Sequence, residues 1–154
     1  MRSLYEGLVR LGDALRPLVL LALRVVIGVG FFHAGRGKFG NLDGIVEYFG
    51  ALGIPAPQLQ APFIAGLELA GGIALVAGLG TRVFALLLSC TMVVALLTEH
   101  RNELGLAFSD FTEVAPLPFL LPLLVLLAFG AGGISVDAFL GGRGAASAKS
   151  KSAS

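Results

Sequence analysis

Four stretches of about 20 predominantly apolar residues constrain the fold of this chain more than any other feature, since a transmembrane α-helix needs about 20 to cross a hydrocarbon core of about 30 Å. They cover residues 17–35, 62–80, 81–98 and 117–134. Only 14% of the 154 residues are charged, whereas soluble domains carry roughly 25%. The sequence therefore predicts an all-α fold, an integral membrane four-helix bundle over residues 17–140.

The two ends of the chain differ from these stretches. Leucines recur at helical spacing at positions 4, 8, 11 and 15 among residues of both charges. This pattern predicts a short amphipathic helix over residues 1–16 that lies in the membrane interface. Residues 141–154 are of low complexity, rich in Gly, Ala and Ser, which predicts a disordered tail.

The connections between the apolar stretches carry two further signals. Residues Gly78-Leu-Gly-Thr-Arg82 join the second stretch to the third, which predicts a tight turn between antiparallel neighbouring helices. Apolar residues between 42 and 52 suggest a short interfacial or re-entrant helix that would cover part of the bundle. Its aromatic pair, Tyr48 and Phe49, is expected to anchor this helix at the interface.

The distribution of Lys and Arg predicts the orientation. Seven of them lie in the N-terminal segment, the turn at 78–82 and the tail, whereas three lie in the other two loops. The positive-inside rule then places both termini in the cytoplasm of a multi-pass protein of the cytoplasmic membrane. The 11 Lys and Arg are offset by 10 Asp and Glu, which argues against nucleic acid as a partner.

Two charged residues, Arg24 and Glu68, lie well inside the predicted spans and away from their ends, where a charge costs several kcal/mol. Glu68 shares a helix face with the small residues Ala61, Ala65 and Gly72, so it is expected to point into the bundle. Arg24 lies roughly 7 Å deeper along the membrane normal, within reach of Glu68. Arg24 could instead extend toward the nearer, cytoplasmic headgroups.

One polar cluster is therefore expected in the outer half of the bundle. Its candidate catalytic residues are Glu68, His100 and Arg24, and its candidate ligand-binding residues are His33, Lys38 and Glu99. Two interpretations stay open: a buried ion pair that only fixes the helix register, or a site that exchanges protons with a bound redox molecule such as a quinone. A metal site is not expected, because the histidines lack close metal-ligand spacing.

Several short motifs, in their order and spacing, resemble the DoxX family of small four-helix membrane proteins. The resemblance covers roughly residues 23–137. The matching segments are Arg24 with Gly28, His33-Ala-Gly-Arg-Gly-Lys38-Phe39, Tyr48-Phe49, Gly53-Ile-Pro55-Ala-Pro57, Glu68-Leu-Ala-Gly-Gly72, Gly78-Leu-Gly-Thr-Arg82, and Met92 with Ala95 and His100.

The resemblance implies a membrane oxidoreductase subunit that handles quinone or thiol-linked redox chemistry. The lone Cys90 lies in an apolar run and is expected to be a small buried hydrophobe. With neither a cysteine pair nor a covalent-cofactor motif, the chain is expected to work with a soluble redox partner protein, and with a second copy of itself if four short helices cannot enclose a site. The alternative is a non-enzymatic membrane anchor or assembly partner for a soluble redox enzyme.

Overall fold

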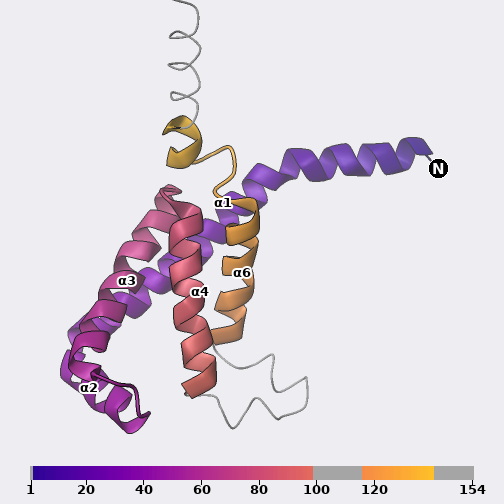
Figure 1. Ribbon diagram of the computed structural model, residues 1–154. Helices are drawn as coiled ribbons and strands as arrows, with labels where there is room; N and C mark the ends of the chain where they lie inside the picture. Colours follow the sequence, from indigo (N-terminus) through magenta and orange to yellow (C-terminus); the bar gives the residue numbers. More distant parts are fainter. Residues whose placement is uncertain (1, 99–115, 141–154) are drawn as a thin grey trace, which may run out of the picture.

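The computed structural model describes residues 2–98 and 116–140, with side chains from residue 5 onward. Its labelled helices are α1 (Arg2–Gly40), α2 (Leu42–Ala51), α3 (Pro57–Ala77), α4 (Thr81–Thr98) and α6 (Pro116–Phe129), and residues 136–140 at the end of the described chain are helical as well. Figure 1 shows α4 between α3 and α6, with α2 at one end of the bundle. The predicted all-helical membrane fold is confirmed. Two candidate site residues, Glu99 and His100, and the predicted tail at 141–154 lie outside the described residues.

Within the described residues, three helices are long and apolar enough to cross a membrane: the part of α1 from Tyr5 to Gly40, α3 and α4. Helix α6 is apolar but has only 14 residues, which corresponds to a rise of about 21 Å, less than the roughly 30 Å of a hydrocarbon core. It ends at Phe129 because Gly130 and Gly132 adopt φ angles of 74° and 77°, in the left-handed region where a helix stops. The four-span count therefore stays a prediction.

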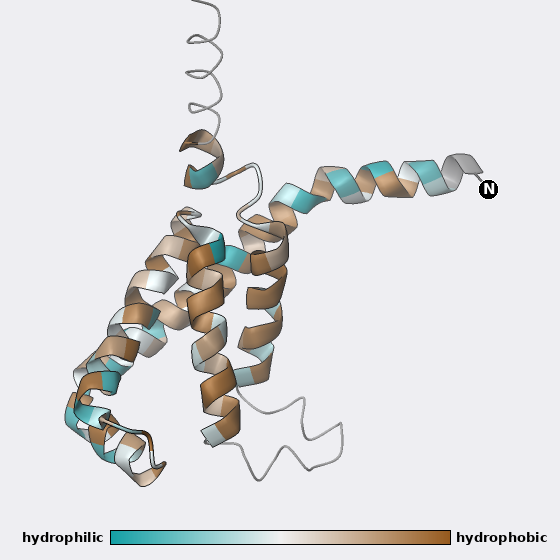
Figure 2. Cartoon of the chain, in the orientation of Figure 1, coloured by the Kyte–Doolittle hydropathy of each residue, from teal (hydrophilic) through white to brown (hydrophobic). Residues whose placement is uncertain are grey.

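Helix α1 is longer than the first predicted span. It runs through Pro17 without interruption, so residues 2–16 are not the separate short helix predicted above. A proline inside a helix removes one backbone hydrogen bond. The helix continues on both sides of Pro17 in spite of this loss. This N-terminal arm, residues 2–16, points away from the bundle (Figure 1), and Leu8, Leu11 and Leu15 are exposed along it. Hydrophilic and hydrophobic residues mix along the arm, whereas α4 and α6 are almost uniformly hydrophobic (Figure 2).

Glycines bring α1 and α3 into close contact. A Cβ at Gly72 would lie 2.6 Å from the carbonyl oxygen of Gly28, and a Cβ at Gly35 would lie 2.6 Å from the amide nitrogen of Leu69. In lipid, such close backbone approach supplies the packing energy that the hydrophobic effect supplies between helices in water. The pairing of residue 28 with 72 and of residue 35 with 69 makes the two helices antiparallel, and it fixes their register.

The connection between α3 and α4 is the predicted tight turn. Helix α3 ends at Ala77, and Gly78 and Gly80 follow with φ angles of 71° and 56°. Helix α4 begins at Thr81, at the residue where the third span was predicted to begin. The antiparallel neighbours expected from this glycine pattern are confirmed.

The apolar core lies between α1, α3, α4 and α6. Its fully buried side chains include Leu75, Leu88, Leu123 and Leu126. Cys90, in contrast, is exposed on α4, so the expectation that it is buried was wrong. An apolar run surrounds Cys90 because α4 presents one face to the core and its other faces outward, where lipid replaces water as the solvent.

Candidate functional site

Glu68 lies on the face of α3 that packs into the bundle. Only 2% of its surface is exposed, and Ala61, Ala65 and Gly72 on the same face are buried as well. The orientation expected from these small residues is therefore confirmed. A carboxylate in this position needs a partner, because a buried charge without one is strongly unfavourable.

That partner is Lys38, near the end of α1. Its Nζ donates hydrogen bonds to Oε1 and Oε2 of Glu68, at 2.7 Å and 2.5 Å. The Lys38 side chain is 25% exposed, whereas that of Glu68 is 3% exposed. Side chains on a helix lean toward its N-terminus, so Lys38 leans back into the bundle and Glu68, on the antiparallel α3, leans toward it.

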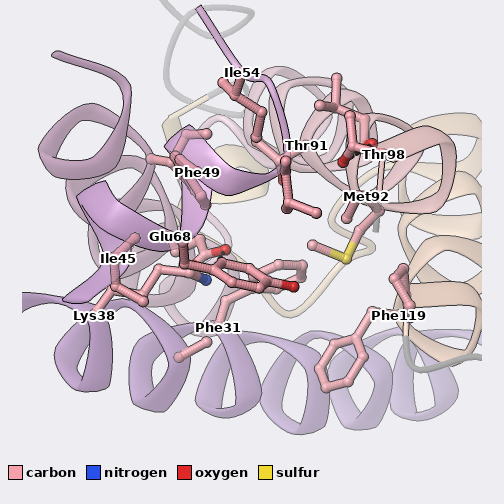
Figure 3. A pocket seen from close by; sticks show the side chains of 17 residues that line it. Phe31, Lys38, Ile45, Phe49, Ile54, Glu68, Thr91, Met92, Thr98 and Phe119 are labelled. Carbon is pink, nitrogen blue, oxygen red and sulfur yellow. Dashed lines mark hydrogen bonds and ion pairs between the residues drawn. The ribbon is translucent and has the colours of Figure 1, made fainter. Parts of the chain in front are cut away.

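The ion pair borders a cavity of about 260 Å³. In Figure 3, Lys38 and Glu68 lie on one side of this cavity, and Met92 and Phe119 lie on the other. The residues that line it come from α1, α2, α3, α4, α6 and the segment after α2: Phe31, Ala34, Lys38, Ile45, Tyr48, Phe49, Leu52, Ile54, Ile64, Glu68, Thr91, Met92, Val94, Ala95, Thr98, Pro116 and Phe119. Most of them are apolar, so the cavity favours a lipophilic ligand.

Helix α2 covers one side of the cavity. The helix expected over residues 42–52 is confirmed as Leu42–Ala51. Ile45, Tyr48 and Phe49 line the cavity, and Phe49 is buried. The aromatic pair expected to anchor the helix at the interface thus contributes to the wall of a binding cavity, because the apolar side of this amphipathic helix packs against the bundle.

The two threonine hydroxyl groups on the cavity wall already donate to the backbone. The hydroxyl groups of Thr91 and Thr98 each donate a hydrogen bond of 2.8 Å to a backbone carbonyl of α4 itself. They keep lone pairs that can accept a hydrogen bond, but no proton to donate. The charge available to a ligand is therefore concentrated at Lys38 and Glu68.

Arg24 is not part of this site. Its guanidinium is 1% exposed and donates to the carbonyl oxygens of Ala131 at 2.5 Å and Ile134 at 2.7 Å. The sequence left open whether Arg24 pairs with Glu68 or extends away from it, and in the structure it bonds to these carbonyl groups instead. On α1 the Arg24 side chain leans toward the N-terminus of the helix, away from Glu68, and the irregular segment after α6 offers it free carbonyl oxygens.

Asp137 completes this second polar region, which we call the Arg24 cluster (Arg24, Ala131, Ile134 and Asp137). Its carboxylate accepts hydrogen bonds from the backbone N–H groups of Gly80 at 2.8 Å and Thr81 at 3.0 Å. A carboxylate at this position satisfies free N–H groups at the start of α4 and interacts favourably with the helix dipole. The Arg24 cluster thus ties α1, α4 and the segment after α6 together.

His33 faces outward from α1. It is exposed and packs edge-on against the Phe32 ring, with 5.8 Å between the ring centroids. It does not line the cavity. Of the six candidate residues, the structure therefore brings together Lys38 and Glu68 and places Arg24 and His33 elsewhere.

Sequence reasoning missed the aromatic and thioether wall formed by Phe31, Met92 and Phe119. Phe31 and Phe119 look like ordinary core residues in the sequence, so no pattern distinguishes them from Leu75 or Leu88. Met92 belongs to one of the family motifs, but nothing in that motif places it on a cavity wall. The pairing of Lys38 with Glu68 did have a signal, because the N-terminal lean of helix side chains applies to both residues.

Fold and site together define a helical membrane protein with a lipophilic cavity and an ion pair on its wall. The family model DoxX matches residues 19–101. This chain belongs to the DoxX family.

Individual relatives support this assignment. The chain is 38% identical over 78 residues to the Bacillus subtilis (strain 168) protein named "Putative oxidoreductase CatD", covering 51% of this chain and 57% of that protein. It is 34% identical over 88 residues to the Escherichia coli (strain K12) "Inner membrane protein YphA", covering 56% of this chain and 63% of the relative. The chain thus spans less than two thirds of these two proteins.

A third relative matches over most of its length. The Escherichia coli (strain K12) "Inner membrane protein YqjF" is 33% identical over 133 residues, covering 82% of this chain and 95% of the relative. No solved structure matches. These relatives are consistent with a membrane protein of several spans.

Proposed function

We propose that this chain is a membrane oxidoreductase subunit that binds a quinone head group in the cavity beside Lys38 and Glu68. The observation that carries the proposal is the pairing of a largely apolar cavity with one ion pair on its wall. A quinone has a matching construction, an apolar ring with polar oxygens at its edge. The name of the Bacillus subtilis relative, an oxidoreductase, also supports it.

The ion pair suits both redox forms of such a ligand. An ammonium group has three N–H donors, and the two bonds from Lys38 to Glu68 leave one for a quinone carbonyl oxygen. The Glu68 carboxylate has further lone pairs that can accept the O–H of a quinol. Reduction of a quinone takes up two electrons and two protons. We assign the exchange of protons to Lys38 and Glu68, and the supply of electrons to a soluble redox partner protein.

The test is the quinone retained by the full chain purified in mild detergent. Mass spectrometry should detect a quinone with the wild-type protein, and Glu68→Gln should retain several-fold less while its helical content is unchanged. Glu47→Gln is the matched control, because Glu47 is exposed on α2 and outside the cavity. If Glu68→Gln and Glu47→Gln retain equal amounts of quinone, the proposed site is wrong.

The alternative function, a non-enzymatic anchor for a soluble redox enzyme, predicts a different result. Purification would then recover a partner protein in stoichiometric amount and no quinone above the level found with an unrelated membrane protein. Glu68→Gln would leave the recovery of that partner unchanged, because the ion pair would only stabilise the bundle.

We also propose that the protein lies in the cytoplasmic membrane with both termini in the cytoplasm. The names of the two Escherichia coli relatives support the location. The arginines near the Arg24 cluster, at positions 16 and 82, support the orientation under the positive-inside rule. A reporter that is active only in the cytoplasm should be active when fused after Ser154. Activity of a periplasmic reporter at that position would contradict this topology.

A further inference from the structure

Three arginines surround the C-terminal end of α6. The guanidinium of Arg16 lies 5.0 Å from the centroid of the Phe129 ring. Arg82 donates a hydrogen bond of 3.3 Å to the carbonyl oxygen of Ala128, and Arg24 bonds to carbonyl groups just beyond the helix end. The last carbonyl groups of a helix carry partial negative charge, which attracts these cations.

The three arginines differ in whether their charge is accessible to a bound anion. Arg24 is buried, with its charge close to that of Asp137. Arg16 and Arg82 are exposed. Among the described side chains, the structure pairs neither of these two with a carboxylate within 4.0 Å. Both therefore carry charge that is free to meet an anion.

A depression of about 380 Å³ lies beside Arg82, between the start of α4 and the end of α6. Asp137 also lines it, but both carboxylate oxygens accept backbone N–H groups at the start of α4. Gly130 forms part of the floor, and a Cβ there would lie 3.2 Å from Nε of Arg82. The absence of a side chain at Gly130 leaves room for the guanidinium.

The depression lies where membrane helices end. Helix α4 begins here and α6 ends here, so this level corresponds to the lipid headgroups in whichever orientation the protein adopts. Val83 and Phe129 border the depression with exposed apolar surface. A cationic rim next to apolar side chains fits a molecule with a phosphate and an acyl chain.

We infer that this depression binds the phosphate group of an anionic phospholipid, with Arg82 on its wall as the ligand and Arg16, which packs on the bordering Phe129 ring, as a second cation nearby. Arginine forms strong, charge-assisted hydrogen bonds to phosphate. A guanidinium has five N–H donors, and the single bond of Arg82 to Ala128 leaves the others free. The site is separate from the Lys38–Glu68 cavity, so it does not depend on the function proposed above.

The experiment measures lipid retention by the full chain. Native mass spectrometry after exposure to mixed phosphatidylglycerol and phosphatidylcholine should show more phosphatidylglycerol bound to the wild-type protein. One cationic residue near the membrane surface contributes about 1 kcal/mol of attraction to anionic lipid, so Arg82→Gln should lower this preference roughly fivefold. Arg16→Gln should lower it in the same direction. Arg36→Gln is the matched control, because Arg36 is an exposed arginine of α1 outside the depression.

Three outcomes would overturn the inference. Equal losses in Arg82→Gln and Arg36→Gln would mean that the attraction is diffuse rather than local. Absence of any phosphatidylglycerol preference in the wild-type protein would exclude the site. Complete displacement of the lipid by inorganic phosphate at millimolar concentration would mean that the depression binds free phosphate. Quinone retention by Arg82→Gln should equal that of the wild-type protein, which keeps this test distinct from that of the proposed function.

Discussion

Among the described residues, two charged groups are buried in the bundle, Arg24 and Glu68, and they are almost equally inaccessible. Their surroundings differ. Arg24 bonds to main-chain carbonyl groups of a folded segment. Glu68 bonds to one flexible side chain and borders a cavity. Main-chain partners hold a charged side chain in one position and thereby stabilise the fold. A side-chain partner beside an empty space can exchange its bonds with a ligand, so the second environment is the one suited to function.

The largest expected effect comes from removing Arg24. Arg24→Met leaves two carbonyl groups without a donor and a gap in the packing, so we expect a loss on the order of 3 kcal/mol in unfolding free energy. Unfolding of the detergent-solubilised protein, followed by circular dichroism, measures it. Arg24→Lys should recover only part of the loss, because an ammonium group lacks the planar fork of a guanidinium. An unchanged unfolding free energy in Arg24→Met would contradict the view that the bonds of Arg24 stabilise the fold.

The α1–α3 contact lies between the two polar regions and should be nearly as sensitive. Gly72→Ala would place a Cβ 2.6 Å from the carbonyl oxygen of Gly28. Separating the helices should cost about 1–3 kcal/mol. Gly50→Ala is the control, because a Cβ at that position would meet nothing within 4 Å. Equal stability of the two variants would show that the helices are not in close contact here.

Double-mutant cycles can distinguish the Lys38–Glu68 ion pair of the structure from an Arg24–Glu68 pair, which the depths of the two residues in the membrane would allow. A double-mutant cycle of Lys38→Met and Glu68→Gln should give a coupling of about 1–2 kcal/mol in unfolding free energy, because each variant removes the partner of the other. The corresponding cycle of Arg24→Met and Glu68→Gln should give less than about 0.5 kcal/mol. A larger coupling in the second cycle than in the first would contradict the arrangement.

The smallest expected effect belongs to Asp137. Asp137→Ala removes the acceptor for two N–H groups at the start of α4, which should lower the unfolding free energy by about 1 kcal/mol. Quinone retention should not change, because Asp137 lies outside the cavity. A loss of retention comparable to that of Glu68→Gln would mean that the two polar regions are coupled.

Much of the fold was predictable from the sequence, because the patterns behind it are local. The turn at Gly78 and Gly80 depends on backbone conformation alone, and the burial of Glu68 follows from the small residues on its own helix face. The partner of Glu68 was not predicted. The prediction rested on the heights of the residues along the membrane normal and did not consider the direction in which the side chains of Arg24 and Lys38 extend.

The cavity shows the same division between local and distant information. Helix α2 was predicted from its apolar periodicity. The contribution of Tyr48 and Phe49 to the cavity wall depends on where α3 and α4 lie relative to α2. The apolar periodicity of α2 gives no information about those positions.

The sequence by itself thus determined that this is a helical membrane protein, where α3 and α4 meet, and that Glu68 faces inward. Hydrophobicity, glycine conformation and helix periodicity are properties of short segments. The tertiary structure decided that Lys38 pairs with Glu68, that Arg24 binds the segment after α6, and that a cavity lies beside the ion pair. Each of these depends on contacts between residues about 30 to 110 positions apart, which form only when the helices pack in one register.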